Sequence, residues 1–366
     1  MIQHIHGEPS FHLSTPELDL DVTQRGGHMA PVVFHLPNGD VSPYSLSPWW
    51  PVEHPEIPPL LSVLRGDFFC LPFGGQVAGP PHGDSANAKW TEISRGDGSL
   101  RLVMNATDSG ARIWKTIDTR PGHHALYLEH QISNLDGDFS YGTHPILDFT
   151  GLADGAGRVT VSPFHWASVC PGPFSNPADG ETQCLAEGAV FSDLREVPLA
   201  AGGMADLTRY PARQGNDDLV MLCHPPATPQ QPFAWSAVVF DKFVWISLKN
   251  PADFPSTLLW MSNGGRTALP WNGKHLGRMG LEDVCSYFAT GVDRSRLNLL
   301  TEHGVSTTRN FRKDLPVMLR TIQAVAAVPR GFGAVRSIVP HPDDVVKITS
   351  DSGREIDIPL EWRHVV

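Results

Sequence analysis

Alternation of apolar and polar residues, more than helical spacing, dominates this sequence. Residues 125–135 (ALYLEHQISNL) are apolar at Leu126 and Leu128, polar at Glu129 and Gln131, and then reach turn-forming residues. This is the pattern of a half-solvated strand that ends in a turn. Further runs that alternate, or are rich in β-branched and aromatic residues, lie at 30–36, 99–106, 111–119, 233–240, 243–250 and 256–263. The pattern therefore predicts many short strands.

Turn signals and helical signals are unequally distributed. Asp241-Lys242 joins two of the predicted strands as a two-residue hairpin connection, and residues 344–362 predict a strand, a Ser-Gly turn and a second strand. The sequence contains 34 glycines and 33 prolines, which favours turns over long helices. Residues 315–328 (LPVMLRTIQAVAAV) are the best candidate for a helix, and residues 284–292 are a weaker one.

The chain shows no internal repeat, no low-complexity block and no break in composition. We therefore expect one domain over residues 1–366, of the all-β class: a large antiparallel β-sandwich with few short helices. Three long proline-rich loops, at 40–60, 170–182 and 224–232, are predicted to be binding or lid segments.

Composition narrows the possible partners. The net charge is −11 and the pI is about 5.8, which argues against nucleic acid, because a phosphate backbone requires a positive protein face. This charge suits a protein that handles neutral or cationic small molecules, and it leaves open a local basic pocket. Ten tryptophans suit either the faces of a sugar site or a large β core.

Sequence signals for export and for membranes are lacking. The first residues, MIQHIHGEPSFHL, have neither a charged start nor an apolar run, and no stretch reaches the length of a membrane helix. The cysteines are odd in number and have no CxxC spacing: Cys70, Cys170, Cys184, Cys223 and Cys285. We expect buried reduced thiols, a cytoplasmic location and no membrane partner. The oligomeric state stays open.

Three segments, in chain order, resemble the aldose 1-epimerase (galactose mutarotase-like) family. The first is LRGDFFCLPFGG (64–75) followed by PPHGDSANAKW (80–90), with an Arg-Gly corner, a strand ending in Pro-Phe-Gly, and His-Gly before a tryptophan. The second is YGTHPILDF (141–149), and the third, residues 258–284, contains Gly-Leu-Glu at 280–282. Residues 24–39 resemble the family's opening hairpin. The most similar branch is that of the hexose-6-phosphate 1-epimerases.

The resemblance implies an isomerase that interconverts the α and β anomers of a free sugar or sugar derivative, with a small-molecule carbohydrate as its partner. Such a reaction needs one carboxylate and one or two imidazoles, and no metal or organic cofactor. By resemblance, Glu282 is the general base, His144 is the general acid, and His82 is a second imidazole near the ring oxygen.

The residues themselves support these roles and also leave alternatives. Apolar neighbours of Glu282 would raise its pKa, but strand alternation allows Asp283 to face the pocket in its place. Pro145 biases His144 to an extended backbone, which fixes the direction of the imidazole, although a core histidine would look the same. His82 lies between a proline and a glycine, where it is either a ligand contact or a turn residue.

Four further residues concern substrate binding. By resemblance, Arg65 contacts a substrate hydroxyl or phosphate; its alternative is an ion pair with Asp67. Asn87 and Trp271 are candidate sugar contacts, whereas the apolar run around Trp260 favours core packing for that residue.

The chain also departs from the family pattern. The phosphosugar branch carries an arginine shortly after His-Gly, where this chain has Ser85, Ala86 and Asn87, and Lys89 could replace it only as a point charge. The aromatic residue expected two positions after His-Pro is Leu147, which suggests a reshaped sugar pocket.

Other chemistries have less support. The HIHGE segment (4–8) lacks the further ligands of a metal site, and neither GxSxG nor a nucleotide-binding glycine pattern occurs in context. Two alternatives on the same scaffold remain: a non-catalytic carbohydrate-binding protein, and a hydrolase or lyase that uses the same carboxylate.

Overall fold

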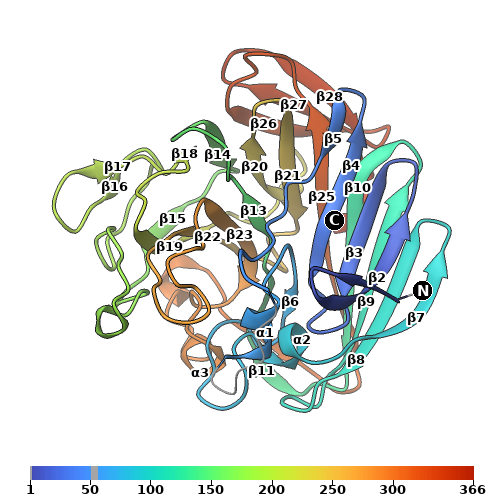
Figure 1. The fold of residues 1–366 in the computed structure, drawn as a ribbon, viewed down its shortest axis with the longest axis horizontal. Coiled ribbons are helices and arrows are strands. Elements are labelled where there is room, and N and C mark those ends of the chain that lie inside the picture. Colours follow the sequence, from blue (N-terminus) through green and yellow to red (C-terminus); the bar gives the residue numbers. More distant parts are fainter. Residues whose placement is uncertain (1, 51–56) are drawn as a thin grey trace.

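The computed structural model describes residues 2–50 and 57–366. Two large antiparallel sheets dominate it (Figure 1). The nine-stranded sheet contains, in spatial order, β18 (Arg209–Tyr210), β14 (Gly157–Val161), β20 (Ala234–Val239), β21 (Phe243–Lys249), β25 (Val317–Ala327), β10 (His123–Ser133), β9 (Arg112–Arg120), β8 (Ser99–Asn105) and β7 (Thr91–Gly96). The seven-stranded sheet contains β15 (Trp166–Val169), β19 (Asn216–Cys223), β22 (Ser256–Asn263), β23 (Arg278–Cys285), β12 (Tyr141–Thr143) and β6 (Phe69–Cys70), with β13 (Ile146–Asp148) also paired to β23.

Smaller sheets and short helices complete the fold. The five-stranded sheet consists of β1 (Ile2–Ile5), β2 (Glu8–Ser14), β3 (Leu18–Thr23), β4 (Met29–Leu36) and β5 (Gly39–Val41). The three-stranded sheet consists of β26 (Val335–His341), β27 (Val345–Ser350) and β28 (Glu355–Pro359). Two-stranded ribbons pair β11 (Gly137–Phe139) with β24 (Arg309–Phe311), and β16 (Val197–Pro198) with β17 (Met204–Ala205). The described helices are α1 (Pro59–Ser62), α2 (Gly83–Asn87), α3 (Val292–Ser295) and the 3₁₀ turns η1 (Pro177–Asp179), η2 (Thr301–His303) and η3 (Trp362–Val365).

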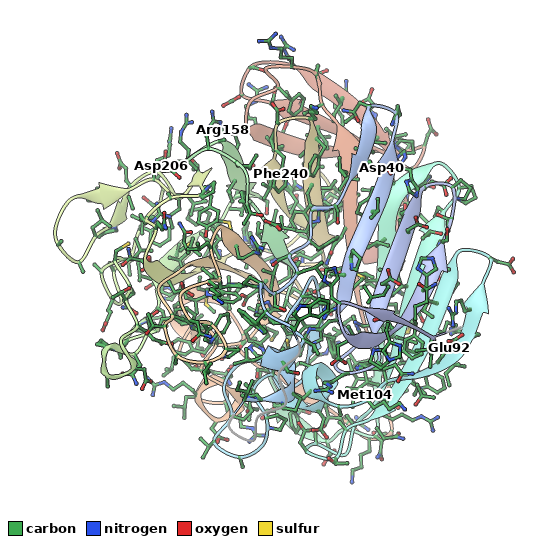
Figure 2. All side chains as sticks on the ribbon, viewed as in Figure 1. Asp40, Glu92, Met104, Arg158, Asp206 and Phe240 are labelled. Carbon is green, nitrogen blue, oxygen red and sulfur yellow. The ribbon has the colours of Figure 1, made fainter. Side chains whose placement is uncertain are left out.

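The nine-stranded sheet is covered on both faces. Its inner face packs against the seven-stranded sheet and the five-stranded sheet, and the three-stranded sheet with η3 covers part of its outer face (Figure 1). Buried side chains such as Met104 and Phe240 fill the layers, whereas Asp40 lies exposed at an edge (Figure 2). The predicted all-β antiparallel sandwich with few short helices is thus confirmed, as are the seven predicted strands and the C-terminal hairpin.

Both helix predictions are wrong. Residues 315–328 contain β25, which lies between β21 and β10 in the centre of the nine-stranded sheet. Leu319 packs in the layer between the large sheets, and Ile322 packs on the opposite face. A strand covered on both faces is apolar nearly throughout, so its sequence resembles that of a buried helix. Within 284–292, β23 ends at Cys285 and the chain turns before α3 begins.

Three further predictions concern the cysteines, membrane helices and the loop 40–60. The five cysteines are free thiols, and all except the half-buried Cys184 are buried. Among the described residues, no helix is both long and apolar enough to cross a bilayer. Part of the predicted loop 40–60, residues 51–56, lies outside the described residues.

Candidate active site

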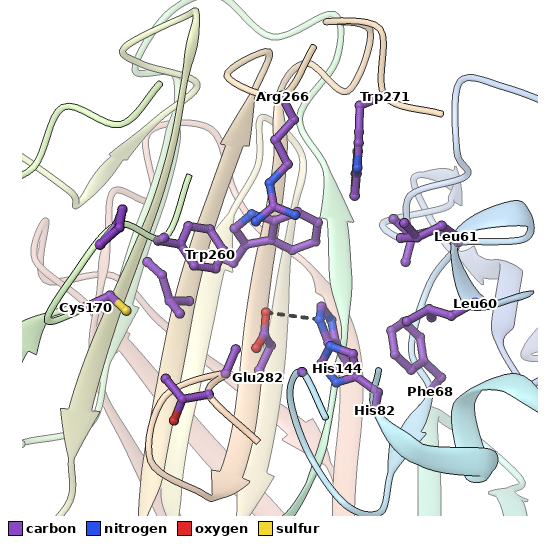
Figure 3. Close-up of a pocket in the computed structure, with 17 residues that line it drawn as sticks. Leu60, Leu61, Phe68, His82, His144, Cys170, Trp260, Arg266, Trp271 and Glu282 are labelled. Atoms are coloured by element: carbon purple, nitrogen blue, oxygen red, sulfur yellow. Dashed lines mark ion pairs between the residues drawn. The ribbon is translucent and has the colours of Figure 1, made fainter. Parts of the chain in front are cut away.

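A pocket of about 350 Å³ opens on the face of the seven-stranded sheet that points away from the nine-stranded sheet (Figure 3). This volume falls in the range of small-molecule sites. The described residues that line it are Leu60, Leu61, Leu64, Phe68, Gly75, His82, His144, Cys170, Pro173, Phe174, Leu219, Trp260, Arg266, Trp271, Glu282, Ala289 and Thr290. Three of them, Cys170, Pro173 and Phe174, come from the predicted proline-rich loop 170–182.

Strand alternation in β23 decides which acidic residue enters the pocket. Glu282 lines the pocket, and its side chain is almost completely buried. Its neighbour Asp283 points the opposite way, into the layer between the large sheets, where it pairs with Lys249 at 2.6 Å. Two residues before Glu282, a Cβ on Gly280 would lie 2.5 Å from Glu282 Oε1. The missing side chain of Gly280 therefore makes the space that the carboxyl group occupies.

His144 is held by backbone and by ring contacts between β12 and β13. Its backbone N–H donates hydrogen bonds to Asp67 Oδ1 at 2.8 Å and to the Phe68 carbonyl at 3.0 Å. Its ring stacks on Phe68 with 4.6 Å between centroids. In this orientation, Nε2 lies 3.3 Å from Glu282 Oε1 (Figure 3). The chain thus brings an imidazole and a carboxyl group together at one wall of the pocket.

His82 has a left-handed backbone conformation that residues other than glycine rarely adopt. It has φ +62° at the start of α2, and the next residue, Gly83, has φ +69° with its Cα so close to Leu71 that a Cβ would lie 2.1 Å from the Leu71 carbonyl oxygen. The Gly74 N–H donates to His82 Nδ1 at 3.3 Å. A neutral ring that accepts at Nδ1 carries its proton on Nε2, so His82 offers a donor at the pocket, and its ring centroid lies 5.1 Å from that of His144.

Burial shifts the pKa values of Glu282, His144 and His82. It raises the pKa of Glu282 well above the ordinary value, opposed by the positive charge of Arg266. It also lowers the pKa of His144 well below 6.5, with a further contribution from His82. Burial lowers the pKa of His82 to about 4. These shifts favour a protonated Glu282 carboxyl group and neutral imidazoles at His144 and His82, so the proton of the Glu282–His144 pair is favoured on Glu282.

Aromatic residues and one cation form the opposite side of the pocket. Trp271, predicted as a sugar contact, lines the pocket and meets Trp260 edge to face at 5.9 Å. Trp260 is buried, as its apolar run predicted, yet it also lines the pocket. Arg266 was missed by the sequence interpretation. The one local signal was its place just after the glycine turn that ends the strand 256–263.

Two residues that were predicted to contact the substrate, Arg65 and Asn87, do not line the pocket. Arg65 is buried and donates to the carbonyls of Ile5 at 2.9 Å and Val63 at 3.0 Å. Its alternative partner, Asp67, accepts instead from the backbone of His144 and from the Gln323 side chain at 2.8 Å. Arg65 therefore stabilises the interior, and Asp67 stabilises the His144 backbone. Neither residue lines the pocket.

Asn87 supports a wall of the pocket from behind. Its side chain accepts a hydrogen bond from the Leu60 N–H at 2.9 Å and donates to the carbonyls of Pro81 and Gly83. All of its polar atoms are therefore used inside the protein. Leu147, which suggested a reshaped pocket, is buried in the layer between the sheets and does not line the pocket, so that inference is corrected.

Metal-ligating side chains are dispersed in the part of the chain that the structure describes. Within residues 2–50 and 57–366, no three His, Cys, Asp or Glu side chains form a group that could hold a metal ion. The HIHGE segment spans the turn between β1 and β2 at the edge of the five-stranded sheet, on elements that contribute no residue to the pocket.

Comparison with known proteins identifies the fold. No protein-family profile matches this sequence, and no curated protein is significantly similar to it. Among solved structures, a galactose mutarotase related enzyme from Lactobacillus acidophilus is 12% identical with a TM-score of 0.54, over 88% of this chain and 98% of that chain. An aldose epimerase homologue from C. elegans is 12% identical with a TM-score of 0.57, over 88% and 100%. A galactose mutarotase-like protein from Clostridium acetobutylicum is 10% identical with a TM-score of 0.57, over 90% and 98%. The chain therefore has the galactose mutarotase-like fold, as the motif resemblance predicted.

Proposed function

We propose that this protein is an aldose 1-epimerase-like isomerase, which interconverts the anomers of a sugar or sugar derivative by general acid–base catalysis. One observation supports this proposal most: the 3.3 Å contact between His144 Nε2 and Glu282 Oε1 in the wall of a pocket of monosaccharide scale. A carboxyl group and an imidazole that share one proton can give a proton to one substrate oxygen and take one from another.

In the proposed reaction, Glu282 first passes its proton to His144 across their 3.3 Å contact, and the resulting carboxylate removes the proton from the C1 hydroxyl. The C1–O bond to the ring oxygen breaks, and the imidazolium of His144 gives its proton to that oxygen. The open aldehyde rotates about C1–C2, and the reverse transfers close the ring on the other face. Each proton that leaves the enzyme returns to it, so no oxidant, reductant or cofactor is consumed. His82 donates its Nε2–H to a substrate oxygen and orients the sugar.

Glycoside hydrolysis is less well supported. Retaining and inverting glycosidases generally use two carboxyl groups on opposite sides of the scissile bond. Among the described residues that line the pocket, Glu282 is the one acidic side chain. The pocket therefore supports proton shuttling at a single anomeric centre better than cleavage of a glycosidic bond.

Anomer exchange measured by NMR tests the proposal directly. Freshly dissolved neutral and acidic monosaccharides are followed with and without protein, and we expect the protein to accelerate equilibration of at least one of them. Sugar binding in calorimetry without faster exchange would favour a carbohydrate-binding protein. New reducing ends or unsaturated products from oligosaccharides would favour a hydrolase or lyase. Either result would overturn the isomerase proposal.

The pH profile gives a second test. Because burial lowers the pKa of His144, the Glu282–His144 pair should take up a second proton only at a pH well below 6.5. The reaction requires one shared proton, so we expect kcat/KM to persist as the pH falls through 6.5. Polarimetry from pH 4 to 9, corrected for the uncatalysed rate, measures this. An acid limb with its midpoint at or above pH 6.5 would contradict the assignment of the pair.

Substitution of Gly280 by Ala tests the positioning of the carboxyl group. The added Cβ would lie 2.5 Å from Glu282 Oε1 and 3.3 Å from the Trp260 Cβ, so the carboxyl group must move. A displacement of this scale should reduce kcat by about 10- to 100-fold. Thermal unfolding measured beside the kinetics separates this effect from loss of the fold. Unchanged kcat in a folded variant would show that the carboxyl position is not critical.

A further inference from the structure

Arg266 is a cation whose hydrogen-bonding capacity is unused within the described protein. It extends from the turn after β22, and its guanidinium points into the pocket, toward the side where Glu282 and His144 lie (Figure 3). Its side chain is 20% exposed. Its side chain forms no hydrogen bond with a described residue, and the buried Nε, which lies in an ion pair with Asp217, has no hydrogen-bond partner. A guanidinium carries five N–H donors, so the Arg266 side chain can donate hydrogen bonds to a ligand that bears oxygen atoms.

The acidic residue near Arg266 does not occupy these donors. Asp217 Oδ2 lies 3.5 Å from Arg266 Nε, which gives Coulombic attraction without a hydrogen bond. The Asp217 carboxyl group instead accepts from the Ser262 hydroxyl at 2.7 Å and from the backbone N–H of Asn263 at 3.1 Å and of Gly265 at 2.9 Å. Asp217 therefore holds the turn that carries Arg266, while the outer part of the guanidinium faces the pocket.

Three aromatic rings fix the guanidinium in place. Its Cζ lies 4.7 Å from the Phe174 ring centroid, 5.2 Å from that of Trp271 and 5.7 Å from that of Trp260. Such cation–π contacts hold the charge without consuming its N–H donors. The Trp260 indole also lies 5.7 Å from the His144 ring, so one side chain separates the cation from the proposed acid–base pair. A single small ligand can reach both.

From this arrangement we propose that the substrate is an acidic monosaccharide whose carboxylate forms a bidentate pair with Arg266. This inference rests on the proposed function and names its substrate class. A planar guanidinium matches the two oxygens of a carboxylate, and charge-assisted pairs are roughly twice as strong as neutral hydrogen bonds. In a protein of net charge −11, a cation kept available in a pocket favours an anionic ligand over a neutral one.

Two features of the pocket favour a carboxylate over other groups. Arg266 is the one Lys or Arg among the described lining residues, and a single guanidinium balances a monoanion better than a phosphate dianion. The neighbouring walls include Leu60, Leu61, Leu219 and Phe174, whose apolar side chains do not compete for the guanidinium donors and strengthen a charge pair by excluding water. A hexuronic acid in its pyranose form combines one carboxylate with a free anomeric hydroxyl, as the proposed reaction requires.

The test compares five probes by anomer exchange: the acids D-galacturonate and D-glucuronate, the methyl ester of D-galacturonate, D-galactose and D-glucose 6-phosphate. We expect kcat/KM for at least one uronate to exceed that for the ester and for galactose by about 10- to 100-fold, the effect of a hydrogen-bonded charge pair. In Arg266→Gln, the ratio of acid to ester should fall by at least tenfold, and Arg266→Lys should fall between Gln and wild type.

Controls separate this inference from the proposed function. Arg209→Gln removes an exposed charge outside the pocket and should preserve the ratio. Calorimetry of uronate binding to Glu282→Gln needs no turnover: Arg266-dependent binding there would support the acidic ligand even if no sugar showed faster exchange. Exchange that is as fast for the ester, for galactose or for the phosphate as for both uronates would overturn the inference while leaving the isomerase proposal standing. An equal loss for acid and ester in Arg266→Gln would also overturn it.

Discussion

Replacement of Glu282 by Gln is expected to reduce kcat/KM for anomer exchange by about 10²- to 10⁴-fold, the usual contribution of a general acid–base group. The amide has nearly the same shape, so the contact with His144 is kept. It cannot take the proton from the C1 hydroxyl, because an amide oxygen is too weak a base. The measurement is NMR or polarimetric exchange on protein whose unfolding transition has been compared with that of the wild type.

The comparison needs a matched change elsewhere. Glu196→Gln removes an exposed carboxylate outside the pocket and should leave exchange unchanged. His144→Asn should lose activity by a similar factor, and the double variant with Glu282→Gln should lose little more, since two groups that act as a unit are not additive. Wild-type exchange in a folded Glu282→Gln variant would remove the carboxyl group from the mechanism.

The success of the strand predictions has a simple physical origin. Strands that alternate, such as β10, have one face in the core and one that is less buried, and their sequence records that asymmetry. β25 is covered on both sides, so its sequence records burial but not period, and the helix prediction failed there. Local sequence therefore reports how a segment is exposed more reliably than which element it forms.

The residues that line the candidate pocket were predicted in part, for a related reason. Glu282, His144 and His82 each stand in a distinctive local context, and the fold brings these contexts to one pocket. Arg65 stands in an equally distinctive Arg-Gly corner, but its direction depends on carbonyl groups of the N-terminal strand that the local sequence does not reveal. Arg266 has no such context; its role as a pocket cation depends on tertiary contacts with Asp217 and the aromatic rings.

The buried ion pair behind the pocket carries the largest expected effect on stability. Lys249 of β21 and Asp283 of β23 join the two large sheets, and both side chains are almost inaccessible to solvent. Lys249 Nζ also donates to the Ser256 carbonyl at 2.8 Å, and Asp283 accepts from the Ser247 hydroxyl at 3.0 Å. Asp283 directly follows Glu282, so the pair fixes the strand that presents the proposed base.

Lys249→Met should lower the free energy of unfolding by about 3–5 kcal/mol, because it leaves the Asp283 carboxylate buried without its counter-ion. Adding Asp283→Asn removes that charge and keeps an acceptor for Ser247, so the double variant should be more stable than Lys249→Met alone. Urea unfolding followed by tryptophan fluorescence measures both. Lys347→Met, which breaks the exposed pair with Glu355, should change stability little. A double variant less stable than Lys249→Met would show that the loss comes from packing and the Lys249 hydrogen bonds, and not from an unpaired charge.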